Sequence, residues 1–403
     1  MSKFILLIRL VILVLLKSCW GRCHIPKTLK LVNLVFRHGD RTPVRTYPTD
    51  PYDENFWPNG LGQLTEEGVK QQYELGQFLR NRYDLFLDRQ YKRRQIYVRS
   101  TDKDRALLSA QSCLSALYNH SNIGIRGINW QPVPIHTVQI EKDFLLYPHY
   151  DCPRYKQLWK KSIEEMDLSQ YQSFYEYVAK HAGLKQKEMD IQWLWHIAGT
   201  LMVQVSNGLT LPSWVTPDVY DTIIRLKDIE FQMKGHIPEM IRVTGGNLLK
   251  KMINDTEALF KAELDEQMKM FMYSAHDTTV SVVLRALKNF NGLMPPYSTC
   301  VMLEAHDTGV GEPYIQIHLR NDTSRPPYHL TLQGCTPDCP LSRFKEILLP
   351  LLPQDIDTEC RLKFSTAAPV IGFTSSVLVM LFLVTFCPCL SCKNWTRYVI
   401  KYS

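Results

Sequence analysis

The two ends of this 403-residue chain lack acidic residues, because no Asp or Glu lies before Cys23 or after Phe364. Seven basic residues lie in these ends, which equals the whole formal net charge of +7. The long segment between them, which we call the body, is therefore formally neutral. A nucleic-acid-binding protein needs a surplus of basic residues on its surface, so we expect no nucleic acid as a partner.

Residues 367–390 lack any charged side chain and form one apolar run. A run of this length can cross a bilayer of about 30 Å as a transmembrane helix, and a buried core helix is the less favoured alternative. Basic residues follow the run, so the positive-inside rule places residues 391–403 in the cytoplasm as a tail. We expect a single-pass type I membrane protein that contacts the membrane through this helix.

The first residues resemble a secretory signal peptide, approximately residues 1–23. Their apolar run from Phe4 to Leu16 is broken only by Arg9, and small residues follow it. A signal at this end and an anchor at the other would place the body, residues 28–362, in the lumen of a compartment or outside the cell.

The composition of the body agrees with an oxidising compartment. It has few cysteines, an even number, and these are Cys113, Cys152, Cys300, Cys335, Cys339 and Cys360. Such usage predicts disulfides. Cys335 and Cys339 are close enough to pair; zinc binding is the alternative, but no second cysteine pair at suitable spacing is present. Asn119, Asn254 and Asn321 begin Asn-x-Ser/Thr sequences and are predicted glycosylation sites.

No internal repeat or low-complexity tract interrupts the body, and its patterns change along the chain. Apolar runs first alternate with helical patterns, an order typical of a parallel sheet with helices on its faces. Residues 151–235 are charged, aromatic and helix-periodic, which predicts an inserted helical cap. Tyr314–Leu319 and Tyr328–Leu332 alternate like antiparallel edge strands. We predict an α/β fold: a mixed, largely parallel central sheet with helices on both faces, and a smaller helical cap.

Three apolar segments, distant in sequence, end in arginine or histidine. Leu31–Phe36 precedes Arg37, His38 and Arg41; Gln95–Val98 precedes Arg105; and Met270–Tyr273 precedes His276 and Asp277. Open α/β sheets bind ligands at the carboxyl ends of their strands. The three segments together predict one pocket that binds an anion and contains a nucleophile.

The arginines of this pocket suit a phosphate group. Guanidinium groups stay charged and match phosphate oxygens bidentately, so Arg37, Arg41 and Arg105 predict a site for a dianion. Arg105 also lies in the first turn of a helix that we expect Thr101 or Asp102 to cap, which adds positive potential. Neighbouring cations lower the pKa of His38, so this imidazole stays neutral and can attack phosphorus.

The leaving alkoxide then needs a proton, for which Asp277 is the best candidate. A bound phosphate dianion would raise the pKa of this carboxyl. His276, if protonated, would be a fourth phosphate ligand. The alternative is a two-metal hydrolase with ligands His38, Asp40, His276 and Asp277, but three arginines would repel divalent metals. We expect no metal or cofactor, and Asp40 to form a salt bridge with Arg41 or Arg37.

The segment Arg37–Pro43 resembles the R-H-G-x-R-x-P signature of the histidine acid phosphatases, and Tyr273–Asp277 resembles their distal His-Asp pair. The likeness covers nearly everything between Leu29 and Cys360. Within the family, the sequence resembles above all the animal prostatic, lysosomal and testicular acid phosphatases. It implies a core like that of phosphoglycerate mutases, a helical cap and a homodimer without metal. It also implies a phosphohistidine at His38, proton donation by Asp277, and phosphate binding by the pocket arginines and His276.

The family pattern further implies the disulfides Cys152–Cys360 and Cys335–Cys339. One departure concerns a cysteine that the group usually carries before Leu-Pro-x-Trp and that pairs with the equivalent of Cys300. Here that neighbourhood has no cysteine, so Cys113 and Cys300 either pair outside the family pattern or remain free thiols. Neither belongs to the pocket, so we expect no loss of chemistry.

Two functional hypotheses follow. The first is an acid phosphatase that hydrolyses phosphate monoesters. The second is a non-catalytic membrane receptor for phosphorylated ligands. The presence of both His38 and Asp277 favours the enzyme, because binding alone requires neither a nucleophile nor an acid.

Overall fold

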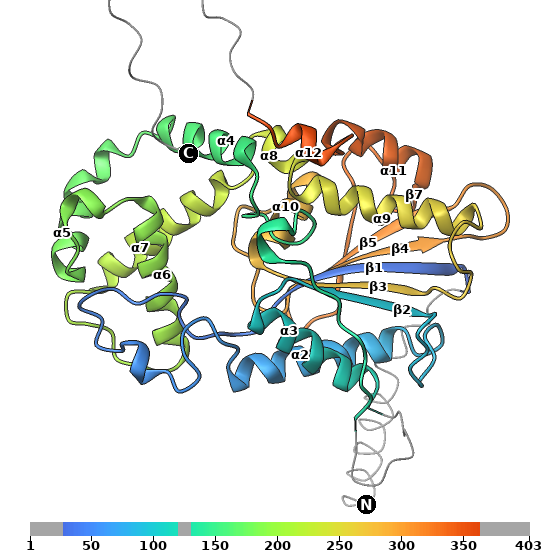
Figure 1. Cartoon of the computed structure of the whole chain (residues 1–403), viewed down its shortest axis with the longest axis horizontal. Helices are drawn as coiled ribbons and strands as arrows, with labels where there is room; N and C mark the ends of the chain where they lie inside the picture. The colour runs from blue at the N-terminus through green and yellow to red at the C-terminus, as the bar shows by residue number, and fades with distance from the viewer. Residues whose placement is uncertain (1–26, 120–129, 363–403) are drawn as a thin grey trace, which may run out of the picture. The chain divides into compact units, whose positions relative to one another are not determined.

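The computed structural model describes residues 27–119 and 130–362, which form a mixed α/β fold (Figure 1). The strands are β1 (Leu29–Arg37), β2 (Ile96–Ser100), β3 (Met270–Ala275), β4 (Cys300–His306), β5 (Tyr314–Arg320), β6 (Tyr328–Leu330) and β7 (Cys339–Pro340). The α-helices are α2 (Glu66–Arg82), α3 (Asp104–Leu117), α4 (Pro153–Glu164), α5 (Gln172–Ala182), α6 (Ile191–Ser206), α7 (Pro217–Met233), α8 (Pro238–Arg242), α9 (Gly245–Phe260), α10 (Asp277–Ala286), α11 (Leu341–Leu348) and α12 (Ile356–Glu359). Short 3-10 helices are η1 (Glu54–Phe56), η2 (Ile140–Lys142), η3 (Ser169–Tyr171), η4 (Gln186–Glu188) and η5 (Leu349–Leu351).

The predicted signal peptide and transmembrane helix, residues 1–23 and 367–390, lie outside the described residues. Within residues 27–119 and 130–362, no helix has the length and apolar character to cross a membrane.

The strands form one seven-stranded sheet in the order β2-β3-β1-β4-β5-β6, with β7 paired to β5. The predicted mixed sheet is confirmed, but its description as largely parallel is wrong. Among the described strands, the β1–β3 and β2–β3 pairs are parallel, whereas the β1–β4, β4–β5, β5–β6 and β5–β7 pairs are antiparallel. The reason is that β4, β5 and β6 follow one another without an intervening helix, and short connections favour antiparallel neighbours.

Helices cover both faces of the sheet. In Figure 1, α2 and α3 lie on one side of the strands, and α9, α10 and α11 lie on the other. Strand β1 serves both layers because successive side chains point to opposite faces. Leu34 and Phe36 pack in the core toward α2 and α3, whereas Leu31 and Val35 pack in the core toward α9 and α10.

Helices α4 to α7 occupy the segment for which the sequence predicts a cap. Of the described residues between 151 and 235, none belongs to a strand. Helices α5, α6 and α7 have a hydrophobic core of their own, which includes Val178, Leu201 and Leu226. In Figure 1 these three helices lie beyond one end of the sheet. Tyr47, from the loop after β1, is buried in the same core and joins this region to the first strand.

The described part of the chain contains two disulfides, Cys152–Cys360 and Cys335–Cys339, the pairs that the family resemblance implies. Cys113 and Cys300 are buried and form no disulfide, so of the two alternatives for this pair the structure has the thiols. Burial raises the pKa of both thiols, which keeps them protonated and unreactive.

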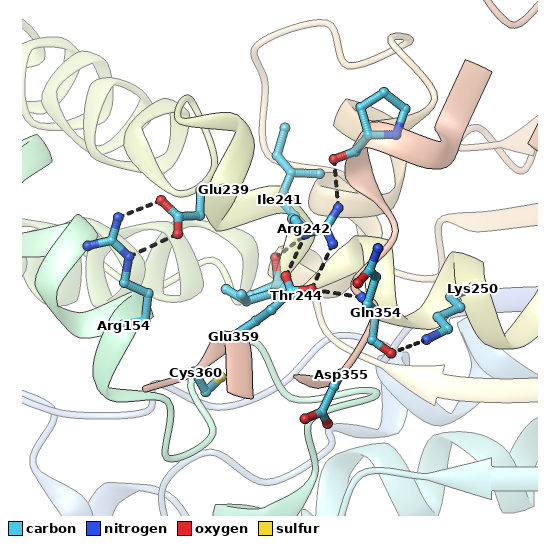
Figure 2. Close-up of polar contacts among 12 residues, drawn as sticks. Arg154, Glu239, Ile241, Arg242, Thr244, Lys250, Gln354, Asp355, Glu359 and Cys360 are labelled. Atoms are coloured by element: carbon cyan, nitrogen blue, oxygen red, sulfur yellow. Dashed lines mark hydrogen bonds and ion pairs between the residues drawn. The ribbon is translucent and has the colours of Figure 1, made fainter. Parts of the chain in front are cut away.

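Polar contacts near Cys360 join α4 to α8 and attach the end of the body to α8 and α9 (Figure 2). Arg154 of α4 donates to both carboxylate oxygens of Glu239 on α8, and Arg242 of α8 does the same to Glu359 of α12. Lys250 of α9 donates to the carbonyl of Gln354 at 2.7 Å. We call Arg154, Glu239, Arg242 and Glu359 the C-terminal ion-pair cluster.

Candidate active site

The register of the parallel strands aligns the three predicted strand ends. Phe36 and Ser100 both lie opposite Ser274 of β3. The residues that follow these three strands therefore emerge at the same level of the sheet edge. His38 and His276 meet there, with ring centroids 5.5 Å apart. The juxtaposition that the sequence predicts thus follows from strand pairing.

His38 is held by the backbone of the next residue. It is only 2% exposed, and its Nδ1 lies 2.8 Å from the carbonyl oxygen of Gly39. Because a carbonyl can only accept, Nδ1 carries the proton and Nε2 keeps its lone pair. Burial lowers the pKa of His38 well below 6.5, and the charges of Arg105 and Arg37 lower it further. The ring is neutral, as expected. Burial lowers its pKa more than the neighbouring cations do.

Gly39 permits the tight turn that follows His38. A Cβ at this position would lie 2.3 Å from the carbonyl oxygen of Gly68 in the first turn of α2. The chain can therefore pass over the beginning of α2 only without a side chain here. This explains why a glycine follows the histidine.

Arg37 is the most enclosed of the arginines, at 1% exposure. It donates through Nη1 to the carbonyl of Pro295 at 2.6 Å, and its Nη2 lies 3.1 Å from Oδ2 of Asp277. Its guanidinium also lies 4.0 Å from the centre of the Tyr297 ring. A cavity opens at this edge of the sheet. Arg41 and Arg105 are among the described residues that line it, and Arg37 is not.

Arg41 and Arg105 lack carboxylate partners within residues 27–119 and 130–362. Arg41 donates only to the carbonyl of Thr42, at 3.0 Å. The Nε of Arg105 is buried without any hydrogen-bond partner. Burial, together with the neighbouring Arg41, lowers the pKa of Arg105 to about 10. Two cations held together with so little compensation make a site for an anion.

His276 and Asp277 lie where β3 meets α10. Nε2 of His276 lies 3.0 Å from Oγ1 of Thr101, which ties two of the three strand ends together. Burial and Arg105 lower the pKa of His276 well below 6.5, so without a ligand it is neutral rather than a charged phosphate ligand. Burial alone would raise the pKa of Asp277, but Arg37, Arg41 and Lys234 outweigh it and lower the pKa to about 2.

Two local expectations are wrong. Asp40 forms no ion pair within the described part of the chain; its Oδ2 instead accepts from Oγ1 of Thr65 at 2.6 Å. Helix α3 begins at Asp104 after Lys103, without a side-chain cap from Thr101 or Asp102. Thr101 is instead turned to His276, and Arg105 still lies in the first turn of α3.

These groups open into a cavity of about 590 Å³. Its floor includes His38, Arg41, Arg105, His276 and Asp277, all predicted from the sequence. Its far wall includes Trp195, Glu230 and Lys234 from the helical segment, and Tyr147, which precedes α4, also lines the cavity. Sequence reasoning missed these four residues. No sequence pattern marks these side chains, because an isolated charge or aromatic residue on an amphipathic helix resembles any other.

The remaining predicted sites lie away from the cavity. Asn119 and Asn254 are exposed, and Asn321 is half-buried. Within residues 27–119 and 130–362, no group of three or more His, Cys, Asp or Glu side chains is arranged to hold a metal ion.

Comparison with known proteins gives consistent results. The model of the histidine phosphatase superfamily (branch 2) matches residues 28–320. Human prostatic acid phosphatase is 40% identical over 349 residues, which covers 84% of this chain and 89% of that protein. Human lysosomal acid phosphatase is 39% identical over 346 residues, 83% of this chain and 81% of that protein. Mouse testicular acid phosphatase is 39% identical over 360 residues, 85% of this chain and 84% of that protein.

Among solved structures, the phytase of Hafnia alvei in its apo form shares the fold with a TM-score of 0.61. The match covers 84% of this chain and 100% of the phytase at 17% identity. At this identity the similarity concerns the fold alone.

Proposed function

The chain belongs to branch 2 of the histidine phosphatase superfamily, and we propose that this acid phosphatase hydrolyses phosphate monoesters through a phosphohistidine on His38. One observation carries the mechanism. The hydrogen bond from Nδ1 to the Gly39 carbonyl leaves the lone pair of Nε2 available at the cavity, in a ring that burial keeps neutral. A neutral imidazole among arginines is a nucleophile with a phosphate beside it.

Arg41 and Arg105 bind the phosphoryl oxygens directly, since both line the cavity and neither has a carboxylate partner in the described structure. Arg37 forms an ion pair with Asp277 in the free protein, and it approaches the phosphate when that ion pair opens. His276 donates a hydrogen bond to a phosphoryl oxygen once the bound dianion raises its pKa. These groups stabilise the charge that spreads over the oxygens in the transition state.

The chemistry takes two steps. Nε2 of His38 attacks phosphorus, the bond from phosphorus to the alcohol oxygen breaks, and Asp277 gives its proton to the departing oxygen. Water then attacks the phosphohistidine and passes a proton to the Asp277 carboxylate. Inorganic phosphate leaves, and His38 returns to its neutral form.

The pKa of Asp277 explains why such an enzyme works in acid. A carboxyl with a pKa of about 2 is ionised at any physiological pH and cannot donate a proton. A phosphate dianion draws Arg37 and Arg41 toward itself and adds negative charge beside the carboxylate. Both effects raise the pKa of Asp277, and a low ambient pH completes its protonation.

The test replaces the nucleophile. We expect His38→Ala to reduce kcat by about 1000-fold or more, since the variant lacks the proposed nucleophile. A burst of labelled phosphate on the wild-type protein, trapped in alkaline denaturant because phosphohistidine is acid-labile, should be absent in this variant. His236→Ala is the matched control, because His236 is exposed and bonds only to the Met233 carbonyl within the described residues.

Retained turnover in His38→Ala would contradict the mechanism. Binding of phosphorylated ligands by a wild-type protein without any turnover would favour the receptor hypothesis. Activity that EDTA abolishes would favour the metal hypothesis.

We also propose that residues 28–362 lie in the lysosomal lumen or outside the cell, anchored through residues 367–390. The two disulfides support an oxidising compartment. Glycosidase treatment should lower the apparent mass if Asn119, Asn254 or Asn321 carries a glycan. Protease protection of intact vesicles would test the membrane orientation, and sedimentation would test the expected homodimer.

A further inference from the structure

The segment of residues 295–299, between α10 and β4, contacts the side chain of Arg37 in two ways that the proposed mechanism does not use. The carbonyl oxygen of Pro295 accepts from Nη1 of Arg37 at 2.6 Å, and the guanidinium lies 4.0 Å from the centre of the Tyr297 ring. Tyr297 is half-buried and does not line the cavity. A planar guanidinium is attracted to the face of an aromatic ring, so the ring covers one side of Arg37 and leaves the edge of the group for hydrogen bonds.

The same segment also fixes the backbone that carries Arg37 and His38. The amide of Arg37 donates to the carbonyl of Thr299 at 2.9 Å, and the amide of Ser298 donates to the carbonyl of His38 at 3.3 Å. From α2, Nε2 of Gln72 donates to the carbonyl of Arg37 at 2.9 Å and to Oγ of Ser298 at 2.8 Å. Gln72 and Ser298 are both buried, and hydrogen bonds in the interior are stronger than those in water. The segment therefore has a defined position relative to the end of β1.

The backbone of this segment is strained at Ser298. Its φ is +59°, in the left-handed region that residues with a side chain rarely adopt. Among the described residues other than glycine, Ala262 and Lys288 share such a φ, but both are exposed, whereas Ser298 is 2% exposed. Strain of this kind persists only where the surrounding structure holds it, and it is concentrated at functional sites. The strained turn presents the Pro295 carbonyl and the Tyr297 ring to the guanidinium.

We propose that Tyr297 is a positioning residue for Arg37 in the phosphatase reaction. This inference rests on the proposed function, in which the ion pair between Arg37 and Asp277 opens when phosphate binds. The Tyr297 ring and the Pro295 carbonyl do not depend on that ion pair, so they still hold the guanidinium after Nη2 is released. Nη2 then turns toward the phosphate from a fixed starting orientation. Precise orientation matters, because a misplacement of about 1 Å can lower the rate of an enzyme by about 100-fold.

The first test removes the ring. We expect Tyr297→Leu to lower kcat/KM for a chromogenic phosphomonoester by about 10-fold to 100-fold, because the guanidinium loses the surface that orients it. Tyr297→Phe keeps an aromatic face and should stay within about threefold of the wild type. Phe290→Leu is the matched control with unchanged kcat/KM, since it removes a ring 3.9 Å from the guanidinium of Arg285, and neither residue lines the cavity. A wild-type value in Tyr297→Leu, or equal losses in Tyr297→Leu and Tyr297→Phe, would overturn the role of the ring.

A double-mutant cycle with Arg37→Met shows whether Tyr297 acts through the arginine. We expect Tyr297→Leu to lower kcat/KM by less than about twofold when Arg37 is already replaced, since no guanidinium is left to orient. A purely structural role of the ring would give the same loss in both backgrounds and would overturn the proposal, as would a wild-type kcat/KM in Arg37→Met.

Either of these two results would leave the proposed function intact, which His38→Ala tests by itself. Absence of turnover by the wild type would instead overturn the proposed function, and this inference with it. If Tyr297→Leu does not fold, Tyr297→Met takes its place in the cycle, because methionine also lacks an aromatic face.

Discussion

Arginines have opposite surroundings in two regions of this molecule. In the C-terminal ion-pair cluster, Arg154 and Arg242 each face a carboxylate that accepts two hydrogen bonds (Figure 2). In the cavity, Arg41 and Arg105 have no carboxylate partner in the described structure, and beside it Arg37 pairs with Asp277. Paired charges hold segments together, whereas crowded like charges are retained at a cost in stability because a ligand compensates them.

Removing a cavity arginine should separate activity from stability most strongly. We expect Arg105→Met to lower kcat/KM by about 100-fold or more, because a charge-assisted contact to the phosphate is lost. The free energy of unfolding should stay constant or rise, since the variant removes a buried cation that Arg41 repels. Kinetics with a chromogenic phosphomonoester and urea denaturation measure the two effects.

Arg154→Met is the matched control from the other region. It should keep its kcat/KM and unfold more easily, because the variant loses an ion pair and neither Arg154 nor Glu239 lines the cavity. A clear loss of stability in Arg105→Met would remove the contrast between the two regions.

The disulfide beside the C-terminal cluster should have the next largest effect. We expect Cys152→Ser/Cys360→Ser to lower the free energy of unfolding by about 2–5 kcal/mol, because the bridge closes a long loop in the unfolded chain. Cys335→Ser/Cys339→Ser, which opens a loop with a sequence separation of 4, should cost less. Thermal melts of both double variants compare the two bridges, and equal losses would mean that loop length does not decide the effect.

Acidification should weaken the cavity region specifically. The pKa of His38 is lowered in the folded protein, so below about pH 6.5 the unfolded chain binds a proton that the folded chain does not. The free energy of unfolding must therefore fall as the pH falls below 6.5. Asp277 loses its own stabilising ionisation only between about pH 4 and 2, well below this window.

We expect His38→Gln to show a smaller loss of stability than the wild type between pH 7 and 5, measured by urea denaturation at each pH. A variant of the C-terminal cluster, Arg242→Met, should keep the wild-type dependence over the same range. Identical pH dependence in His38→Gln and the wild type would contradict the assigned lowering of the pKa.

The smallest effect should come from the C-terminal cluster itself. Glu359 and Arg242 are partly exposed, so solvent screens their attraction. We expect Glu359→Gln to lower the free energy of unfolding by about 1 kcal/mol with unchanged kcat/KM. An effect on kcat/KM beyond about twofold would show that this cluster is coupled to the cavity.

The cavity floor could be predicted because its residues lie directly after apolar runs. A buried strand is evident from its composition, and parallel strands must present their carboxyl ends at the same edge. His38, Arg41, Arg105, His276 and Asp277 were therefore found together, and the structure brings them together.

Helix α2 shows where pattern reading reaches its limit. Threonine is a favoured N-cap residue, and Thr65 Oγ1 accepts from the Gly68 amide at 3.0 Å. The spacing predicts a buried stripe through Val69, Tyr73, Gly76, Leu79 and Tyr83; the last three are buried, but Val69 and Tyr73 are exposed. At Gly76 a Cβ would lie 2.0 Å from the carbonyl oxygen of Cys113 on α3. The close backbone approach of α2 and α3, which hydropathy does not record, determines which face of α2 is buried.

Local chemistry in the chain was enough to specify the proposed nucleophile, the proposed acid and the arginines around them, because each is defined by its residue type and by the strand that precedes it. The far wall was decided by tertiary packing alone. Glu230, Lys234 and Trp195 line the cavity only because α6 and α7 pack beside the sheet edge. Their burial there strengthens electrostatic interactions that would be weak on a solvent-exposed helix.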